Sequence, residues 1–392
     1  MKVYNRRMSS PPRKRIEYID LLRGWAVIVM IQTHVFNAVL RPEITTTASF
    51  QWLKFVDGLV APSFLFASGL AFAVTTRRKL QDYLSFGHPL FRQLQRLLFI
   101  LLLGYAMHLP SFRFDRLMRE TGPEEWRVFF QADILHCIAV SLLLMQGLLL
   151  VLRSEARLYK VLAGVTTAVI IVTPVMWEID FQRLLPALIA AYLNGRTYSL
   201  FPFFPWSAFL FAGAITGYRY VEARQREPEG GDRKMMNVAA LAGLTGIAAS
   251  FALEPIARSL YPVYDYWLSS PSFVLFRLGL VLLLCYGMFS YEKERGVSRL
   301  SPVTLIGSES LIVYVAHLML LYGKHGGKTF QESVGRTFGW YRAALTALVL
   351  VMLMYGLAWV WHRIKQGPPR LKLAIELGTL AVFAGTFFLP SP

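Results

Sequence analysis

An arginine and a histidine lie on one face of the first apolar segment of the chain. Arg23 and His34 stand in RGWAVIVMIQTH, separated by ten residues. Eleven steps of about 100° bring a helix back almost to the same face, about 16 Å further along its axis. Ionisable groups inside an apolar helix are costly and are therefore candidates for function. An imidazole can accept a proton in a group transfer, and a guanidinium can bind phosphate groups.

Other histidines and carboxylates are expected at the same depth as His34. They fall near the same ends of other apolar segments: Asp57, His108, Asp133, His136 and His317. Asp133 and His136 in QADILHCIAV share a helix face at i, i+3, and so do Tyr314 and His317 in SESLIVYVAH. For any one of these histidines, a hydrogen bond between two helices is as good an explanation as chemistry. Their convergence from several helices favours a polar site.

Within this set we assign His34, Asp133 and His136 to catalysis, because a carboxylate commonly fixes the tautomer of a histidine that accepts a proton. Asp57, Tyr314 and His317 are assigned to a substrate pocket. Clustered His and Asp side chains also bind zinc, but HExxH and CxxC spacings are absent from the sequence, so we expect no metal.

A second set of charged residues is expected at the opposite end of the same segments. It comprises Asp20, Arg23, Arg92 and Arg96. In one interpretation the arginines bind the phosphates of an anionic cytosolic ligand. In the other, Asp20 neutralises Arg23 near the lipid headgroups, where a long basic side chain reaches water at modest cost. The sequence leaves both open.

The segments that position these residues identify a membrane protein. The 392 residues are 55% hydrophobic and their mean hydropathy is +0.44. Apolar runs recur at about the 20 residues that cross a bilayer. The sequence therefore predicts an all-α, polytopic bundle of about eleven transmembrane helices, over residues 17–40, 53–75, 93–110, 132–152, 158–177, 200–220, 236–253, 273–290, 302–322, 341–363 and 372–389.

The net charge of +17 reflects topology rather than nucleic-acid binding, because most of the basic residues fall in alternate short connections. These connections are expected in the cytoplasm, facing anionic lipids. We expect a basic cytoplasmic tail over 1–16, a retained first helix, and one transmembrane domain over 17–390. The N-terminus is then cytoplasmic and the C-terminus extracytoplasmic. The long connections at 110–131, 178–199, 254–272 and 323–340 leave room for an extracytoplasmic site.

Proline, glycine and two buried charges mark special places in the predicted helices. Pro62 predicts a kink, since proline removes a helix hydrogen bond. Gly213 and Gly217 predict a close contact between helices. Glu309 and Arg277 lie inside predicted spans, and Glu309 could carry protons or pair with an arginine, whereas Arg277 has no explanation from the sequence. The aromatic residues of YPVYDYWLSS could stack on sugar rings, although the aromatic belt at a membrane surface explains them more simply.

Several segments resemble one superfamily, the transmembrane acyltransferases. RIEYIDLLRGWAVIVMIQTH is similar to the first helix of the heparan-alpha-glucosaminide N-acetyltransferase catalytic-domain family and of its YeiB-like bacterial relatives. The spacing of Arg23 and His34 is similar to that in the acyltransferase 3 family. APSFLFASGLAF, the FPFFPW segment and GSESLIVYVAH resemble the corresponding family segments. The resemblance extends from Arg15 to about Tyr322.

The resemblance implies an enzyme that transfers an acyl group, commonly acetyl, across the bacterial inner membrane. Cytosolic acyl-CoA is then the co-substrate, no cofactor is tightly bound, and a sugar or glycan outside is the acceptor. His34 becomes the proton acceptor and Arg23 a donor contact, with Asp20, Arg92 and Arg96 beside it. Trp206 of FPFFPW joins Asp57, Tyr314 and His317 in the acceptor pocket.

The chain departs from these families at two places. Three residues separate Arg92 from Arg96, whereas the acyltransferase 3 pattern has two. The connection RPEITTTASFQW contains no histidine, although the lysosomal branch has its active-site histidine there, so His34 is the first-helix candidate that remains.

A transporter of a polar solute is the alternative function. Glu309, His317 and the other histidines would then form a proton relay. Carriers often contain paired repeats with interrupted helices, and the sequence shows no such repeat. Consumption of acyl-CoA in the presence of an acceptor distinguishes the two functions.

Overall fold

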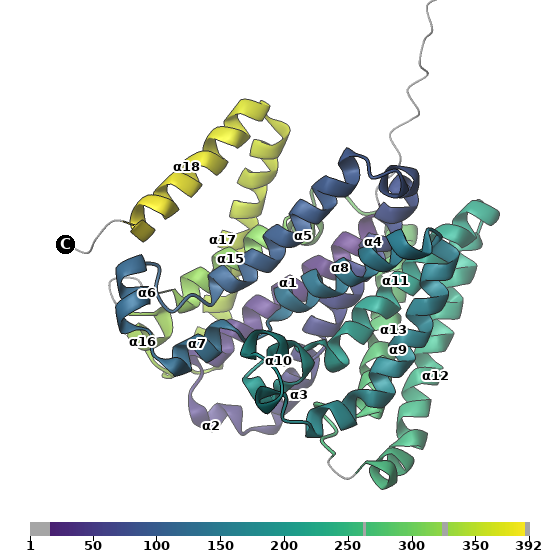
Figure 1. Ribbon diagram of the computed structural model, residues 1–392, viewed down its shortest axis with the longest axis horizontal. Coiled ribbons are helices and arrows are strands. Elements are labelled where there is room, and N and C mark those ends of the chain that lie inside the picture. Colours follow the sequence, from purple (N-terminus) through teal and green to yellow (C-terminus); the bar gives the residue numbers. More distant parts are fainter. Residues whose placement is uncertain (1–15, 262–263, 324–327, 389–392) are drawn as a thin grey trace, which may run out of the picture.

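The computed structural model describes residues 16–261, 264–323 and 328–388, and these are almost entirely helical. The basic tail expected over 1–16 lies outside the described residues except for Ile16, as does residue 389 of the last predicted helix. Figure 1 shows a bundle of long helices joined by short ones. The long helices are α1 (Glu17–Val39), α4 (Val60–Leu84), α5 (His88–Met107), α8 (Ile134–Leu152), α9 (Glu155–Glu178), α11 (Phe203–Arg226), α12 (Gly231–Leu260), α13 (Pro271–Arg295), α17 (Trp340–Gln366) and α18 (Pro369–Phe388).

The short helices lie in the connections. They are α2 (Pro42–Thr45), α3 (Ala48–Asp57), α6 (Phe114–Glu120), α7 (Pro123–Phe129), η1 (Phe181–Arg183), α10 (Ala187–Leu193), η2 (Gly195–Thr197) and α16 (Phe330–Val334). Two further helices, α14 (Pro302–Ser308) and α15 (Ser310–Tyr322), form one broken span with a bend of 90°.

The prediction of an all-α membrane bundle is confirmed. Among the described residues, nine helical segments are long and apolar enough to cross a membrane, and the α14 and α15 pair makes a tenth. The one predicted span not among these ten is 200–220, which corresponds to α11; it falls short of that apolarity but is heavily buried by its neighbours. A helix that faces protein rather than lipid tolerates more polar residues, because its surroundings satisfy them.

Glycines bring α4 and α11 into close contact, as the sequence predicts. A Cβ atom on Gly213 would overlap the backbone of Phe66, and one on Gly217 would press on Leu70. The interruption expected from Pro62 lies just before it: α3 ends at Asp57 and α4 begins at Val60, so Pro62 stands in the first turn, where its missing N–H is no loss.

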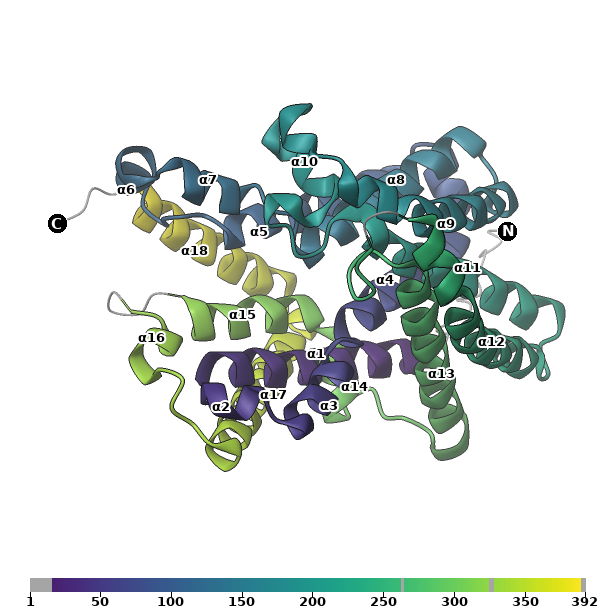
Figure 2. The same ribbon diagram turned by 90° about the horizontal axis from the view of Figure 1, so that it is seen from below.

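The broken span is attached to α1. A Cβ on Gly24 of α1 would overlap the carbonyl of Val303, and one on Gly307 would overlap the carbonyl of Asp20. Figure 2 shows α15 running alongside α1, with which it is in contact. Since only glycine permits such close backbone contact, α14 and α15 are held in a fixed position on α1.

Two ends of the bundle are distinguished by the direction of α1. The Glu17 end carries the start of α1, the end of α4 and the start of α5; the Val39 end carries their opposite termini. Apolar side chains form a core around α4, α8 and α11 that includes Tyr314, and a second core around α1 and α17 that includes Val313. Helix α15 therefore lies between the two cores.

Candidate functional site

His34 and His317 meet at the Val39 end of the bundle. Each lies five residues from the end of its helix, α1 or α15, which is about 8 Å. The Nδ1 atom of His34 is 2.9 Å from the Nε2 atom of His317, and the ring centroids are 5.2 Å apart. His317 is fully buried, whereas His34 is partly accessible. One ring is thus hidden and the other can be reached.

The hydrogen bonds of this pair define where its protons lie. The Nδ1 atom of His317 is 2.9 Å from the carbonyl oxygen of Val313, which can only accept, so this nitrogen carries the proton. In the neutral ring Nε2 of His317 is then an acceptor, and Nδ1 of His34 must donate to it. The Nε2 atom of His34 consequently keeps its lone pair, which is the state of a general base.

Tyr314 links the histidine pair to α8. Its ring centroid lies 5.8 Å from that of His317, and its hydroxyl donates to Oδ2 of Asp133 at 2.7 Å. Asp133 is the N-cap of α8 and accepts from the backbone N–H of Ile134 at 2.5 Å. Tyr314 and Asp133 are both buried. The carboxylate is thus held by a helix terminus and a hydroxyl.

His136 lies one turn into α8 and completes the cap. Its Nδ1 atom accepts the backbone N–H of Asp133 at 3.1 Å, so Nε2 carries the proton. The ring packs edge-on against Tyr105 at 4.3 Å and lies 5.9 Å from His108. Within the described residues, Nε2 of this fully buried side chain has no hydrogen-bond partner. An unpaired buried donor is unusual and marks a functional candidate.

Three tyrosines that the sequence analysis missed line this region. The hydroxyls of Tyr105 and Tyr192 are 2.8 Å apart, and burial raises the pKa of Tyr192 above its usual range, so it is a neutral hydroxyl. Tyr322 donates to the backbone carbonyl of His34 at 3.2 Å. The spacing of Tyr105 and His108 on one helix face could have indicated the first, but no sequence signal identifies Tyr192 or Tyr322.

The remaining predicted pocket residues lie beside this network. With its amide oriented to satisfy both groups, Gln32 donates to Oδ1 of Asp57 at 3.2 Å, which ties α3 to α1 two residues before His34. Trp206 on α11 packs against Phe201 at 4.9 Å and Phe273 at 6.3 Å. The structure therefore places both Asp57 and Trp206 at the Val39 end of the bundle.

The predicted donor residues are not all gathered in one place. Asp20 is buried on α1 against Gly307, and Arg23 is half-buried on the next turn. Arg92 and Arg96 lie on exposed faces of α5, which packs against α4 and α8. Asp20 and Arg23 thus lie close together near the start of α1, whereas Arg92 and Arg96 face outward from α5.

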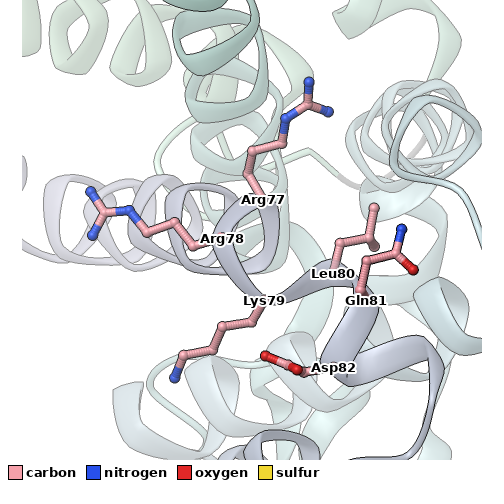
Figure 3. A pocket seen from close by; sticks show the side chains of 6 residues that line it. All are labelled: Arg77, Arg78, Lys79, Leu80, Gln81 and Asp82. Atoms are coloured by element: carbon pink, nitrogen blue, oxygen red, sulfur yellow. The ribbon is translucent and has the colours of Figure 1, made fainter. Parts of the chain in front are cut away.

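Two hollows open at the Glu17 end. One of about 410 Å³ is lined by residues 77–82, where α4 departs from helical geometry at Lys79. Figure 3 shows Arg77 and Arg78 extending in different directions. Arg77 instead pairs with Glu155 at 2.6 Å. The second hollow, of about 280 Å³, is lined by acidic and basic side chains that include Glu17, Arg224 and Lys293. Among the described residues, neither hollow brings several unpaired basic side chains together as a phosphate-binding cluster would.

Glu309 occupies the bend between α14 and α15. It is buried and pairs with Lys365 at 2.8 Å and His362 at 3.3 Å, both on α17. The sequence had left open a pairing with arginine or a proton-carrying role. The structure shows a pairing with lysine and histidine.

Comparison with known proteins adds a family. Residues 15–250 match the family described as heparan-alpha-glucosaminide N-acetyltransferase, catalytic. The match extends from α1 into α12, where it ends at residue 250, and so includes His34, Asp133, His136 and Trp206. No curated protein matches the chain.

Proposed function

The chain belongs to the heparan-alpha-glucosaminide N-acetyltransferase catalytic-domain family, and from that premise we propose that it transfers an acyl group from cytosolic acyl-CoA to an acceptor outside. The family is one of membrane acetyltransferases, and the many apolar helices make this chain a multi-pass membrane protein. The proposed acyl group is acetyl and the proposed acceptor is a sugar or glycan. The proposed location is the bacterial inner membrane, among anionic lipids, with the N-terminus in the cytoplasm and the C-terminus outside.

The hydrogen-bonded pair of His34 and His317 carries this proposal. The carbonyl of Val313 fixes the tautomer of His317, which in turn leaves the Nε2 lone pair of His34 unprotonated. In the proposed reaction, a hydroxyl or amine of the acceptor attacks the thioester carbonyl while His34 takes its proton. The C–S bond then breaks, and the proton on His34 passes to the departing CoA thiolate.

The donor is proposed to reach this base along α1. Arg23 lies about 16 Å from His34 along the helix axis, toward the Glu17 end. A guanidinium there can bind a CoA phosphate, and an extended pantetheine arm can span such a distance. The basic connections at the Glu17 end support a cytosolic position for it. Arg92 and Arg96, exposed on α5, contribute at most to attraction of the anionic donor from a distance.

The test is turnover by purified protein in lipid nanodiscs. Protein is mixed with radiolabelled acetyl-CoA and extracted envelope glycans, and both thiol release and labelled glycan are measured. We expect transfer by the wild type and by His88→Ala, a matched control at an exposed histidine. We expect His34→Ala to lose nearly all transfer. Equal activity of His34→Ala and the wild type would remove His34 from the mechanism.

Transport of a polar solute is the second candidate, and the break at Glu309 favours it. Carriers commonly bind their cargo at interrupted helices, and α14 and α15 form such a break. Flux assays in proteoliposomes address this function. Solute uptake that depends on Glu309, with no turnover of any acyl-CoA, would replace the acyltransferase proposal.

A further inference from the structure

Arg277 is a buried cation that has no carboxylate partner among the described residues. It lies six residues into α13 from the Val39 end, about 9 Å deep, and is 6% exposed. Within the part of the chain that the structure describes, its Nε and Nη1 atoms have no hydrogen-bond acceptor. Buried arginines are normally paired, because an unpaired buried charge is strongly unfavourable. Arg277 is therefore suited to bind a group that the described residues do not supply.

Three aromatic rings surround the guanidinium. Its central carbon lies 5.2 Å from the ring centroid of Phe273, 5.7 Å from that of Phe55 and 5.8 Å from that of Trp267. These rings attract the positive charge. They do not replace oxygen acceptors for the N–H groups, because hydrogen bonds to aromatic rings are weak. The rings thus hold the cation in place and leave its donors available.

The backbone also leaves space for this side chain. A Cβ atom on Gly58 would overlap the guanidinium, so the absence of a side chain there lets the guanidinium lie against the chain between α3 and α4. Among the described residues, no ion pair joins Arg277 to Asp57, the residue before Gly58, and the Oδ1 atom of Asp57 accepts from Gln32 on α1. The guanidinium of Arg277 is thus held between α13 and α3, beside Gly58.

The guanidinium is one side chain away from the surface. Trp267, which covers it, is 54% exposed and belongs to the connection between α12 and α13. Asp265 orders this connection by accepting the backbone N–H of Trp267 at 2.8 Å and that of Leu268 at 3.1 Å. Phe273 reaches from Arg277 to Trp206, which we place in the acceptor pocket. A ligand bound beside Trp206 can therefore approach the cation.

We propose that Arg277 binds an acidic group of the acceptor, a carboxylate, sulfate or phosphate ester, and so selects negatively charged acceptors. This inference rests on the proposed function for the identity of the ligand as acceptor. A guanidinium forms short, charge-assisted hydrogen bonds with each of these groups. Loss of such bonds weakens binding by at least about tenfold.

The experiment measures binding without acyl-CoA. Purified protein in nanodiscs of zwitterionic phosphatidylcholine is titrated with three pairs that differ in charge: galactose and galacturonate, glucosamine and glucosamine 6-sulfate, glucosamine and glucosamine 6-phosphate. We expect the wild type to bind the charged member of at least one pair at least tenfold more tightly, and Arg277→Gln to bind both members equally. Arg342→Gln, an exposed arginine at the same end, should behave as the wild type. Equal binding of all pairs by the wild type, or a preference that survives in Arg277→Gln, overturns the proposal.

A second variant protects the test against misfolding. Gly58→Ala keeps the positive charge and a normal helical backbone, but its methyl group displaces the guanidinium. We expect it to reduce the charge preference several-fold even if Arg277→Gln does not fold. An unchanged preference in Gly58→Ala contradicts the geometry proposed here.

Two further experiments distinguish a saccharide ligand from a lipid ligand, and the anion site from the proposed function. In nanodiscs that contain phosphatidylglycerol, loss of the saccharide preference would identify a lipid headgroup as the ligand and overturn the assignment to the acceptor. Turnover assays with the same pairs distinguish this proposal from the proposed function. Binding that depends on Arg277, with no turnover, would contradict acyl transfer but not the anion site. Turnover without a charge preference would contradict the anion site but not acyl transfer.

Discussion

The candidate residues at the two ends of α1 differ in how they are arranged. At the Val39 end, His34 is joined to His317, and Tyr314 continues the network to Asp133 by hydrogen bonds and ring contacts. At the Glu17 end, Asp20 and Arg23 share α1, whereas Arg92 and Arg96 face outward from α5. One end is a connected network and the other a dispersed field of charge.

This difference separates positioning from attraction. Proton transfer requires donors and acceptors within hydrogen-bond distance, so the groups at the Val39 end must converge. A polyanionic ligand can instead be attracted by several separated cations, because electrostatic forces act over about 8 Å in physiological salt. The geometry thus supports chemistry at the Val39 end and recognition at the Glu17 end.

Removal of His34 should have the largest effect on activity. We expect His34→Ala to lower kcat by about 1,000-fold, since a positioned general base contributes on the order of 10²–10⁴. Steady-state kinetics in nanodiscs measure this loss, and size-exclusion profiles check that the variant remains folded. Partial recovery of kcat by added imidazole would strengthen the assignment, whereas a loss confined to the KM for acceptor would contradict it.

Removal of His317 should have the next largest effect. His317→Leu deletes the acceptor that holds Nδ1–H of His34, and we expect kcat to fall by about 30-fold, as for other residues that orient a reacting group. His317→Gln restores an acceptor oxygen and should lose less. Because the tautomer is disturbed, the pH at half-maximal activity should also shift in His317→Leu. An unchanged pH profile would reduce His317 to a packing role.

Removal of Arg23, at the Glu17 end, should affect donor binding rather than kcat. We expect Arg23→Ala to raise the KM for acyl-CoA by about tenfold, the loss of one charge-assisted contact, and to leave kcat within a factor of two or so. Arg78→Ala, an exposed arginine at the same end, is the control. Titration of each variant with acyl-CoA measures its KM and kcat. A fall in kcat without a change in KM would place Arg23 outside the donor site.

Loss of the Tyr314 hydroxyl should have the smallest effect on activity. Tyr314→Phe leaves one oxygen of the buried Asp133 without its donor, which costs about 1–3 kcal/mol of stability. We expect a measurable decrease in Tm and a several-fold lower kcat. Tyr341→Phe is the control, because that side chain is 80% exposed. If the Tm of Tyr314→Phe equals that of the control, the hydrogen bond contributes nothing.

The sequence predicted the spans better than it predicted their shape. Apolar runs of bilayer length identified all eleven helical regions, and Gly213 and Gly217 indicated the contact of α4 with α11. The bend at Glu309 escaped prediction, because the run 302–322 is apolar enough to be interpreted as one straight span. The pairing of Glu309 with Lys365 and His362 of a distant helix escaped prediction too. Hydropathy reports whether a segment can enter a membrane, but not whether its neighbours allow it to bend.

The site was partly predictable for the same reason. Pairs at i, i+3 on one helix place their side chains on one face, and the structure brings the predicted residues on α1, α8 and α15 together. Which face of α5 turns outward depends on packing against α4 and α8, so the exposure of Arg92 and Arg96 could not be deduced from spacing. Tyr192 and Tyr322 lie in a connection and at a helix end, where no periodicity guides prediction.

The carbonyl of Val313 sets the first link in the proton arrangement, and it belongs to the backbone. Any amino acid except one that breaks α15 supplies the same oxygen at that position. Position 313 is therefore free to vary among related sequences as long as its side chain fits the apolar core, while position 317 is restricted to a side chain that both donates and accepts. An alignment of related sequences should accordingly show His317 as invariant. Position 313, whose backbone carbonyl orients His317, should show no such restriction.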